Sequence, residues 1–151
     1  MTLRALIWIA PALLAVPIAC DQRGKAAAAP ELTPYMSRLQ RYKERLGFAI
    51  EAKNQKLAAY YLKEIGETAE IITLKVPVHD GQPIADNIKT FLAPAIPPLE
   101  RSLTAGDWGA AARGYATLVE SCNGCHVQTR HEFIVVLPAS GEPPHGQKFA
   151  P

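Results

Sequence analysis

Residues 122 to 126 read Cys-Asn-Gly-Cys-His, and this run constrains the chain more than any other feature. A C-x-x-C-H run is the attachment signature of a c-type haem. Two thiols add to the vinyl groups of the porphyrin as thioethers, and the imidazole that follows binds the iron. On a helix, Cys122, Cys125 and His126 share one face, so all three would reach one flat macrocycle. The small residues Asn123 and Gly124 would leave room for the haem edge.

Two nearby thiols have other uses, namely a disulfide or half of a zinc site. Structural zinc needs four ligands, usually completed by a second cysteine or histidine pair at similar spacing, and the sequence holds no such pair. A structural lipoprotein with a Cys122–Cys125 disulfide is the alternative outside haem chemistry. In bacteria haem is attached to c-type cytochromes outside the cytoplasm, so the haem prediction requires an exported chain.

The N-terminus has the pattern of an export signal. Arg4 is followed by an apolar run over residues 5–19 that two prolines interrupt and small residues end. This run is too short and too broken for a good membrane span, which needs about 20 apolar residues. We therefore predict a signal peptide at 1–19.

Cys20 follows the apolar run at the position of the acylated cysteine in a bacterial lipobox, although Pro17 stands where that motif usually has leucine. We predict that Cys20 is lipidated and that residues 20–32 form the anchor and tether. An unlipidated Cys20 would be an odd thiol in an oxidising compartment. Cleavage within the alanines at 26–29 is the alternative.

Composition sets limits on the mature chain. Without the first nineteen residues, 132 residues remain, enough for one domain with a core, and fifteen Lys and Arg face fourteen acids. The sequence has no stripe of basic residues that would indicate nucleic-acid binding. The charges at Arg38, Arg41, Lys43, Glu44 and Arg45 predict a solvated helix face, with docking of an acidic redox partner as the alternative.

Four segments predict helices, because their apolar residues recur at three- and four-residue steps. The first starts at Thr33 as N-cap, and the chain turns near residues 53–54 before the second. The third, over 84–104, should be kinked or split by its prolines. The fourth starts at Asp107 as N-cap. The predicted inward residues are Tyr35, Leu39, Tyr42, Leu46, Ala49 and Ile50; Leu57, Tyr60, Tyr61, Ile65, Ala69 and Ile72; Ile88, Phe91, Leu92, Ala95, Leu99 and Leu103; and Trp108, Ala111, Ala112, Tyr115, Leu118, Val119, Cys122 and His126.

These helices and their mostly short connections predict an all-α chain, an antiparallel four-helix bundle over 33–131 with covalently bound haem on the last helix. The tail, residues 132–151, is rich in proline and glycine and is predicted to be irregular. Its apolar patch at 133–137 should lie against the bundle near the haem. A short strand that pairs with another chain is the alternative for this patch.

The chain resembles the class II cytochromes c, the family of cytochrome c-prime and its low-spin relatives. The resemblance rests on the four helices, the haem motif on the last helix, and the basic residue Arg130 four places after His126. It covers about residues 33–131, and only the fourth-helix motif is specific. It implies one covalent haem c, and it makes a homodimer one of the assemblies to expect. The long tail departs from the family's pattern.

The resemblance also bears on the second axial ligand of the iron. Low-spin members use a methionine from the first helix, whereas cytochrome c-prime has an apolar residue there. Met36 is the only methionine left after Met1 is removed, and it borders the inward stripe, so we predict it as a ligand. A gap-filling core residue is the alternative for Met36, and His79 is the rival ligand. Arg130 is predicted to pair with a haem propionate, with a plain helix-terminal cation as the alternative.

Together these residues predict a non-enzymatic c-type cytochrome that transfers single electrons to redox partner proteins at the bacterial cell envelope, in the periplasm or on the outer face of a membrane. A methionine ligand would favour electron transfer. The alternative function is a five-coordinate haem protein that binds or senses nitric oxide or carbon monoxide, with a distal face lined by residues such as Leu39 or Tyr35. A peroxidase is a weaker idea, because only His79 could form half of a distal acid–base pair.

Overall fold

The computed structural model describes residues 31–151 and is all-helical, as the apolar periodicity predicts. The predicted signal peptide, Cys20 and most of the tether lie outside the described residues. The elements are α1 (Thr33–Glu51), α2 (Gln55–Lys75), α3 (Ile84–Asn87), η1 (Ile88–Leu92), η2 (Ala93–Ala95), α4 (Ile96–Ala105) and α5 (Trp108–Gln128). Within 31–151 there is no strand, and only an isolated bridge joins His79 to Gln82.

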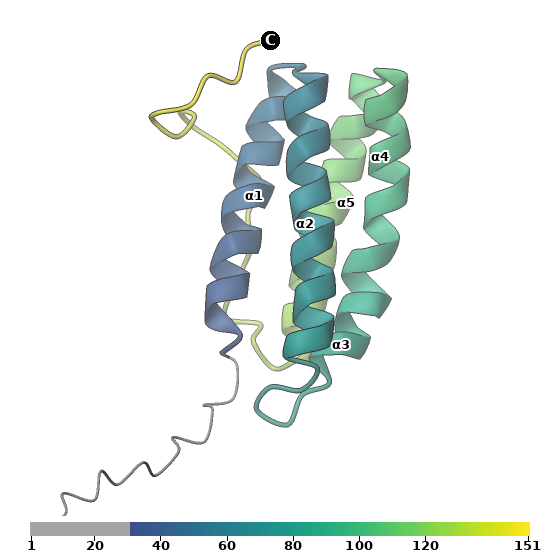
Figure 1. Cartoon of the computed structure of the whole chain (residues 1–151), viewed down its shortest axis with the longest axis vertical. Coiled ribbons are helices and arrows are strands. Elements are labelled where there is room, and N and C mark those ends of the chain that lie inside the picture. The colour runs from purple at the N-terminus through teal and green to yellow at the C-terminus, as the bar shows by residue number, and fades with distance from the viewer. Residues whose placement is uncertain (1–30) are drawn as a thin grey trace, which may run out of the picture.

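The long helices lie side by side as a bundle, with the run from α3 to α4 forming one of its columns (Figure 1). Helix α1 packs mainly on α2, and α4 packs mainly on α5; further contacts join α2 to α4 and α1 to α5. Large aliphatic side chains fill the centre because their burial removes apolar surface from water. The most completely buried of them are Leu46, Ile65, Ile72, Leu99, Leu103 and Leu118.

Side-chain caps hold the starts of α2 and α5, and of these two the cap at Asp107 was predicted. The Asp107 carboxylate accepts a hydrogen bond from the amide of Ala110 at 2.9 Å and caps α5. Asn54 caps α2 in the same way through the amide of Leu57 at 3.1 Å. The prediction of Thr33 as an N-cap is wrong, because Thr33 is already helical and Leu32 precedes α1 without a side-chain cap. Leu32 is buried, so packing rather than a cap holds the start of α1.

The third helix is split where its prolines predict. A wide π turn over 88–92 and a 3₁₀ turn over 93–95 precede α4. Proline has no N–H and clashes with the carbonyl four residues back, so Pro94 cannot continue a regular helix. Pro97 and Pro98 fall in the first turn of α4, where an N–H would lack an intrahelical partner anyway.

The predicted inward stripes are mostly confirmed, with three corrections. Tyr60 is half-exposed and Ala112 is exposed. On this turn of α2 the buried residues are Tyr61 and Leu62, and Tyr60 packs edge-on against the Tyr61 ring at the border of the core. Lys43, predicted on a solvated face, is only 4% exposed. It lies seven residues after Met36, two helical turns along the same side of α1.

Candidate functional site

An apolar cavity of about 420 Å³ lies where α1, η1, α5 and the tail meet. The C-x-x-C-H residues reach it from α5, and aliphatic side chains of the other elements complete its walls. It is lined by Met36, Ser37, Leu39, Gln40, Lys43, Ile88, Leu92, Cys122, Cys125, His126, Ile134, Val135 and Val136. The structure thus brings together four of the predicted site residues, namely Met36, Cys122, Cys125 and His126.

Both thiols of the motif are free in the structure and lie one turn apart on α5. Burial raises the pKa of Cys122 to about 11, although the nearby Lys43 ammonium acts in the opposite direction. Burial also raises the pKa of Cys125. Both sulfurs are therefore thiols rather than thiolates near neutral pH, so neither places a negative charge in the apolar cavity.

His126 is oriented by a hydrogen bond to the tail. Its Nδ1 lies 2.8 Å from the carbonyl oxygen of Ile134. A carbonyl can only accept, so Nδ1 must carry the proton and Nε2 is left with a free lone pair. This is the tautomer in which Nε2 can bind a metal.

Met36 reaches the same cavity from the first turns of α1. Its side chain is partly buried and packs against the core together with that of Leu39. The thioether and the imidazole therefore come from different helices. This is the arrangement in which two side chains could approach one cofactor from separate elements.

Arg130 and His79, the other predicted candidates, lie elsewhere. Arg130 is exposed just beyond α5, with a left-handed φ of 62°, and does not line the cavity. His79 lines a separate hollow beside Asp80 and Glu31. The Nδ1 of His131 donates to the carbonyl of Thr129 at 2.7 Å, which caps the end of α5 locally.

The tail is docked along the bundle, and Figure 1 shows it returning past α1. Phe149 is buried against Phe48, with ring centroids 5.6 Å apart. The amide of Asn54 donates to the carbonyl of Phe149 at 2.9 Å, and the Tyr61 hydroxyl donates to Gln147 at 2.6 Å. The apolar patch of the tail follows α5 directly and contributes one wall of the cavity. The bundle does not cover the patch as expected, because Phe133, Ile134, Val135 and Leu137 are all exposed.

Sequence reasoning missed three features of the site. Lys43 lines the cavity, and only its seven-residue spacing from Met36 could have indicated this. Gly124 was expected to leave room for a haem edge, but a Cβ there would lie 2.9 Å from the Phe91 ring, so its small size serves the packing of α5 on η1. Asn123 was also assigned to the haem edge, and its side chain instead bonds the backbone of Val136.

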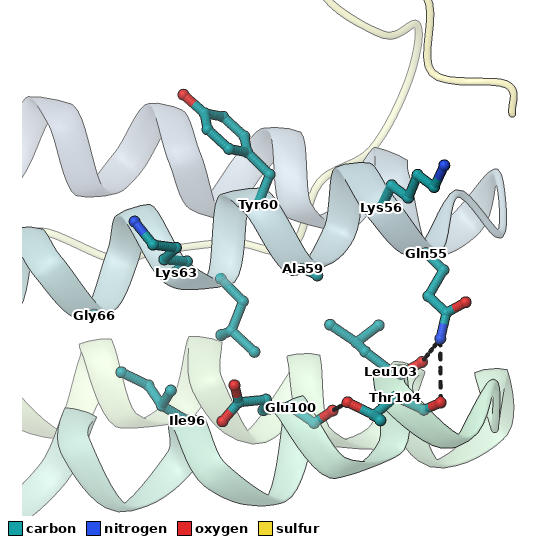
Figure 2. A pocket seen from close by; sticks show the side chains of 11 residues that line it. Gln55, Lys56, Ala59, Tyr60, Lys63, Gly66, Ile96, Glu100, Leu103 and Thr104 are labelled. Atoms are coloured by element: carbon teal, nitrogen blue, oxygen red, sulfur yellow. Dashed lines mark hydrogen bonds between the residues drawn. The ribbon is translucent and has the colours of Figure 1, made fainter.

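A second hollow, of about 570 Å³, lies between α2 and α4 (Figure 2). Gln55 reaches across it from α2 and donates to the carbonyls of Leu103 and Thr104 at 2.7 and 3.1 Å. Its other polar lining side chains include Lys56, Lys63 and Glu100. Although larger, this hollow holds none of the thiol, thioether or imidazole groups that distinguish the first cavity.

Comparison with known proteins found no matching family model, no similar curated protein and no similar solved structure. Among the helices of residues 31–151, none is long and apolar enough to cross a membrane.

Proposed function

We propose that the chain is a c-type cytochrome that carries single electrons between redox partner proteins. Cys122 and Cys125 would hold one haem covalently, and His126 and Met36 would bind its iron. One observation carries the proposal: the three residues of the motif and the only methionine of residues 31–151 line the same apolar cavity.

The chemistry of the lining fits a haem. The cavity offers two thiols for attachment, an imidazole with its Nε2 free, and a polarisable thioether, among aliphatic walls such as Ile88 and Leu92. Its volume of about 420 Å³ lies in the range of about 300–1,000 Å³ usual for ligand pockets. When bound, haem supplies a reversible one-electron couple. The protein's part is to hold the group, exclude water from it and orient its ligands.

We take the helices to run antiparallel with haem on α5, because three residues connect α1 to α2 and two connect α4 to α5. Short connections of this kind are typical of helices that reverse direction.

The location of the protein is proposed from the first thirty residues alone. Their pattern supports export and a lipid on Cys20, which would keep the protein at the cell envelope near membrane-bound redox partners. In cell fractionation, we expect the wild type with the membranes and the Cys20→Ser variant in the soluble fraction or unprocessed. Equal solubility of the two would point to cleavage in the alanine run at 26–29.

Absorption spectra test the proposed function. The chain, expressed with a c-type haem maturation system, should carry haem that survives acid extraction, and Cys122→Ala/Cys125→Ala should not. Full retention of acid-resistant haem in the double variant would refute the attachment residues.

The same spectra test Met36. The wild type should be low-spin, with a weak sulfur-to-iron charge-transfer band and no rapid reaction with carbon monoxide. Met36→Ala should lose this band, lower the reduction potential and bind carbon monoxide, because neither Leu39 nor Tyr35 is a good ligand. A high-spin wild type that binds carbon monoxide rapidly would instead favour the gas-binding function, and a bis-imidazole spectrum would implicate His79.

A further inference from the structure

The segment that follows α5, residues 131–139, lies over the C-x-x-C-H motif, and we call it the strap. Asn123, the first residue between the two cysteines, joins α5 to this strap. Its amide nitrogen donates to the carbonyl of Val136 at 2.9 Å, and its carbonyl oxygen accepts from the amide of Val136 at 2.7 Å. The side-chain amide therefore pairs with Val136 as a neighbouring strand would. A carboxylate or a hydroxyl in its place could not keep both bonds in the same geometry.

Other bonds place the strap on either side of this pair. The Lys43 ammonium donates to the carbonyl of Leu137 at 2.6 Å, and the Ala139 amide donates to the Tyr115 hydroxyl at 3.0 Å. Toward α5, the carbonyl of Ile134 accepts from Nδ1 of His126 at 2.8 Å. Ile134 lies two residues before Val136. The two hydrogen bonds between Asn123 and Val136 therefore also determine the position of the Ile134 carbonyl.

This carbonyl decides which ring nitrogen of His126 carries the proton. A neutral histidine ring in water carries its proton mainly on Nε2, whereas a carbonyl beside Nδ1 requires the proton there. Partners of this kind fix the tautomer and orientation of metal-binding histidines and tune the metal that they bind.

We propose that Asn123 is a positioning residue, which holds the strap so that the Ile134 carbonyl keeps the proton of His126 on Nδ1 and leaves Nε2 free. The consequence for a haem iron rests on the proposed function. The tautomer itself is a property of this chain and is tested separately.

The first experiment is nuclear magnetic resonance of the full chain prepared without haem, with isotope-labelled histidine rings and with circular dichroism as the check of helical content. His126→Gln assigns the His126 signals. In the wild type, Nε2 of His126 should show the shift of an unprotonated nitrogen. In Asn123→Ala, this signal should move to the averaged position of a ring that exchanges between tautomers. His131, the first residue of the strap, is an internal control, because its Nδ1 donates to Thr129 at the end of α5 and forms no hydrogen bond with Ile134 or Val136.

Two further variants test whether the change in the His126 shifts is specific to the Asn123–Val136 hydrogen bonds. Ser121→Ala changes a neighbouring residue of α5 whose hydroxyl donates to Leu118, and it should leave the His126 shifts unchanged. Asn123→Asp keeps an acceptor for the Val136 amide but loses the donor, so it should give a smaller change than Asn123→Ala. If Asn123→Ala loses its helical content, the His126 shifts of Asn123→Asp test the proposal in its place. Wild-type His126 shifts in a folded Asn123 variant would overturn the proposal.

The second experiment uses the protein matured with haem. Loss of the Nδ1–H bond makes His126 a poorer electron donor, so Asn123→Ala should have a higher reduction potential than the wild type, and Ser121→Ala should not. A chain that never acquires haem would refute the proposed function while the tautomer measurement still stands. A loaded Asn123→Ala protein with the wild-type potential would refute the effect on the iron.

Discussion

At the scale of single residues, Lys43 and Cys122 influence each other's protonation in the cavity. Burial lowers the pKa of the Lys43 ammonium, and the nearby Cys122 acts in the opposite direction. Burial raises the pKa of Cys122 to about 11, and Lys43 partly offsets this. Each group therefore favours its neutral form more than it would in water, as expected for a poorly solvated site.

The raised pKa of Cys122 predicts a pH dependence of stability in the chain without haem. The folded chain holds this proton up to about pH 11, whereas an unfolded chain releases it near 9.0. The contribution of Cys122 is therefore fully present below pH 9.0 and is lost as the pH rises through about 11. At 1.4 kcal/mol per pKa unit this amounts to about 3 kcal/mol.

Urea unfolding at a series of pH values measures this contribution, with Cys122→Ser as the control. Burial also raises the pKa of Tyr115, so this residue lowers the free energy of unfolding of both proteins as the pH rises. The pKa of Lys43 is lowered, so this residue raises the free energy of unfolding as the pH rises. The difference between wild type and Cys122→Ser gives the contribution of the thiol together with its coupling to Lys43 and Tyr115. Parallel pH profiles for the two proteins would contradict the assignment.

At the scale of elements, α5 depends on a cap at its first turn. The Asp107 carboxylate bonds the amide of Ala110, which would otherwise lack an intrahelical partner. Asp107→Ala should therefore lower the free energy of unfolding by about 1 kcal/mol. The matched control is Asp86→Ala, which removes only an exposed pair with Lys89 at 3.9 Å and should change stability by less than about 0.5 kcal/mol. Equal effects in urea unfolding would show that the cap contributes nothing specific.

At the scale of the whole molecule, the tail is held where α1, α5 and the strap meet around Gly47. A Cβ at Gly47 would lie 2.6 Å from both the Ala139 methyl group and the Tyr115 hydroxyl. The chain therefore has no space for a larger residue on α1 at this point unless both the strap and the Tyr115 ring move. The absence of a side chain at Gly47 is required by the close approach of Ala139 in the tail and of the Tyr115 ring on α5.

Gly47→Ala should consequently destabilise the protein and loosen the strap. Overpacking costs about 1–3 kcal/mol, and the better helix propensity of alanine returns up to about 1 kcal/mol, so we expect a net loss of about 1–2 kcal/mol. Hydrogen exchange at the Ala139 amide should accelerate. Gly66→Ala is the control, because its Cβ would meet only Ile96, at an ordinary 3.8 Å, and it should stabilise α2 by up to about 1 kcal/mol. Slow exchange at Ala139 in Gly47→Ala would show that the junction tolerates the methyl group.

The helical elements of the fold follow from local signals in the sequence. The three- and four-residue spacing of apolar side chains, the caps at Asn54 and Asp107, and the prolines of the third helix each act within a few residues of the backbone. Such local signals can be interpreted without knowledge of the rest of the chain. They also place the C-x-x-C-H residues on one side of α5, in line with the apolar stripe that contains the buried Leu118.

The surroundings of that motif, in contrast, depend on contacts between elements that lie far apart in the sequence. The burial of Lys43, the place of Met36 on the same cavity, the contact of Gly124 with Phe91 and the pairing of Asn123 with Val136 all depend on how separate elements pack. Helical periodicity gives the face on which a side chain lies but not the partner that this face meets. An irregular tail has no periodicity at all, so its course over the motif follows from hydrogen bonds and side-chain packing that form only in the folded chain.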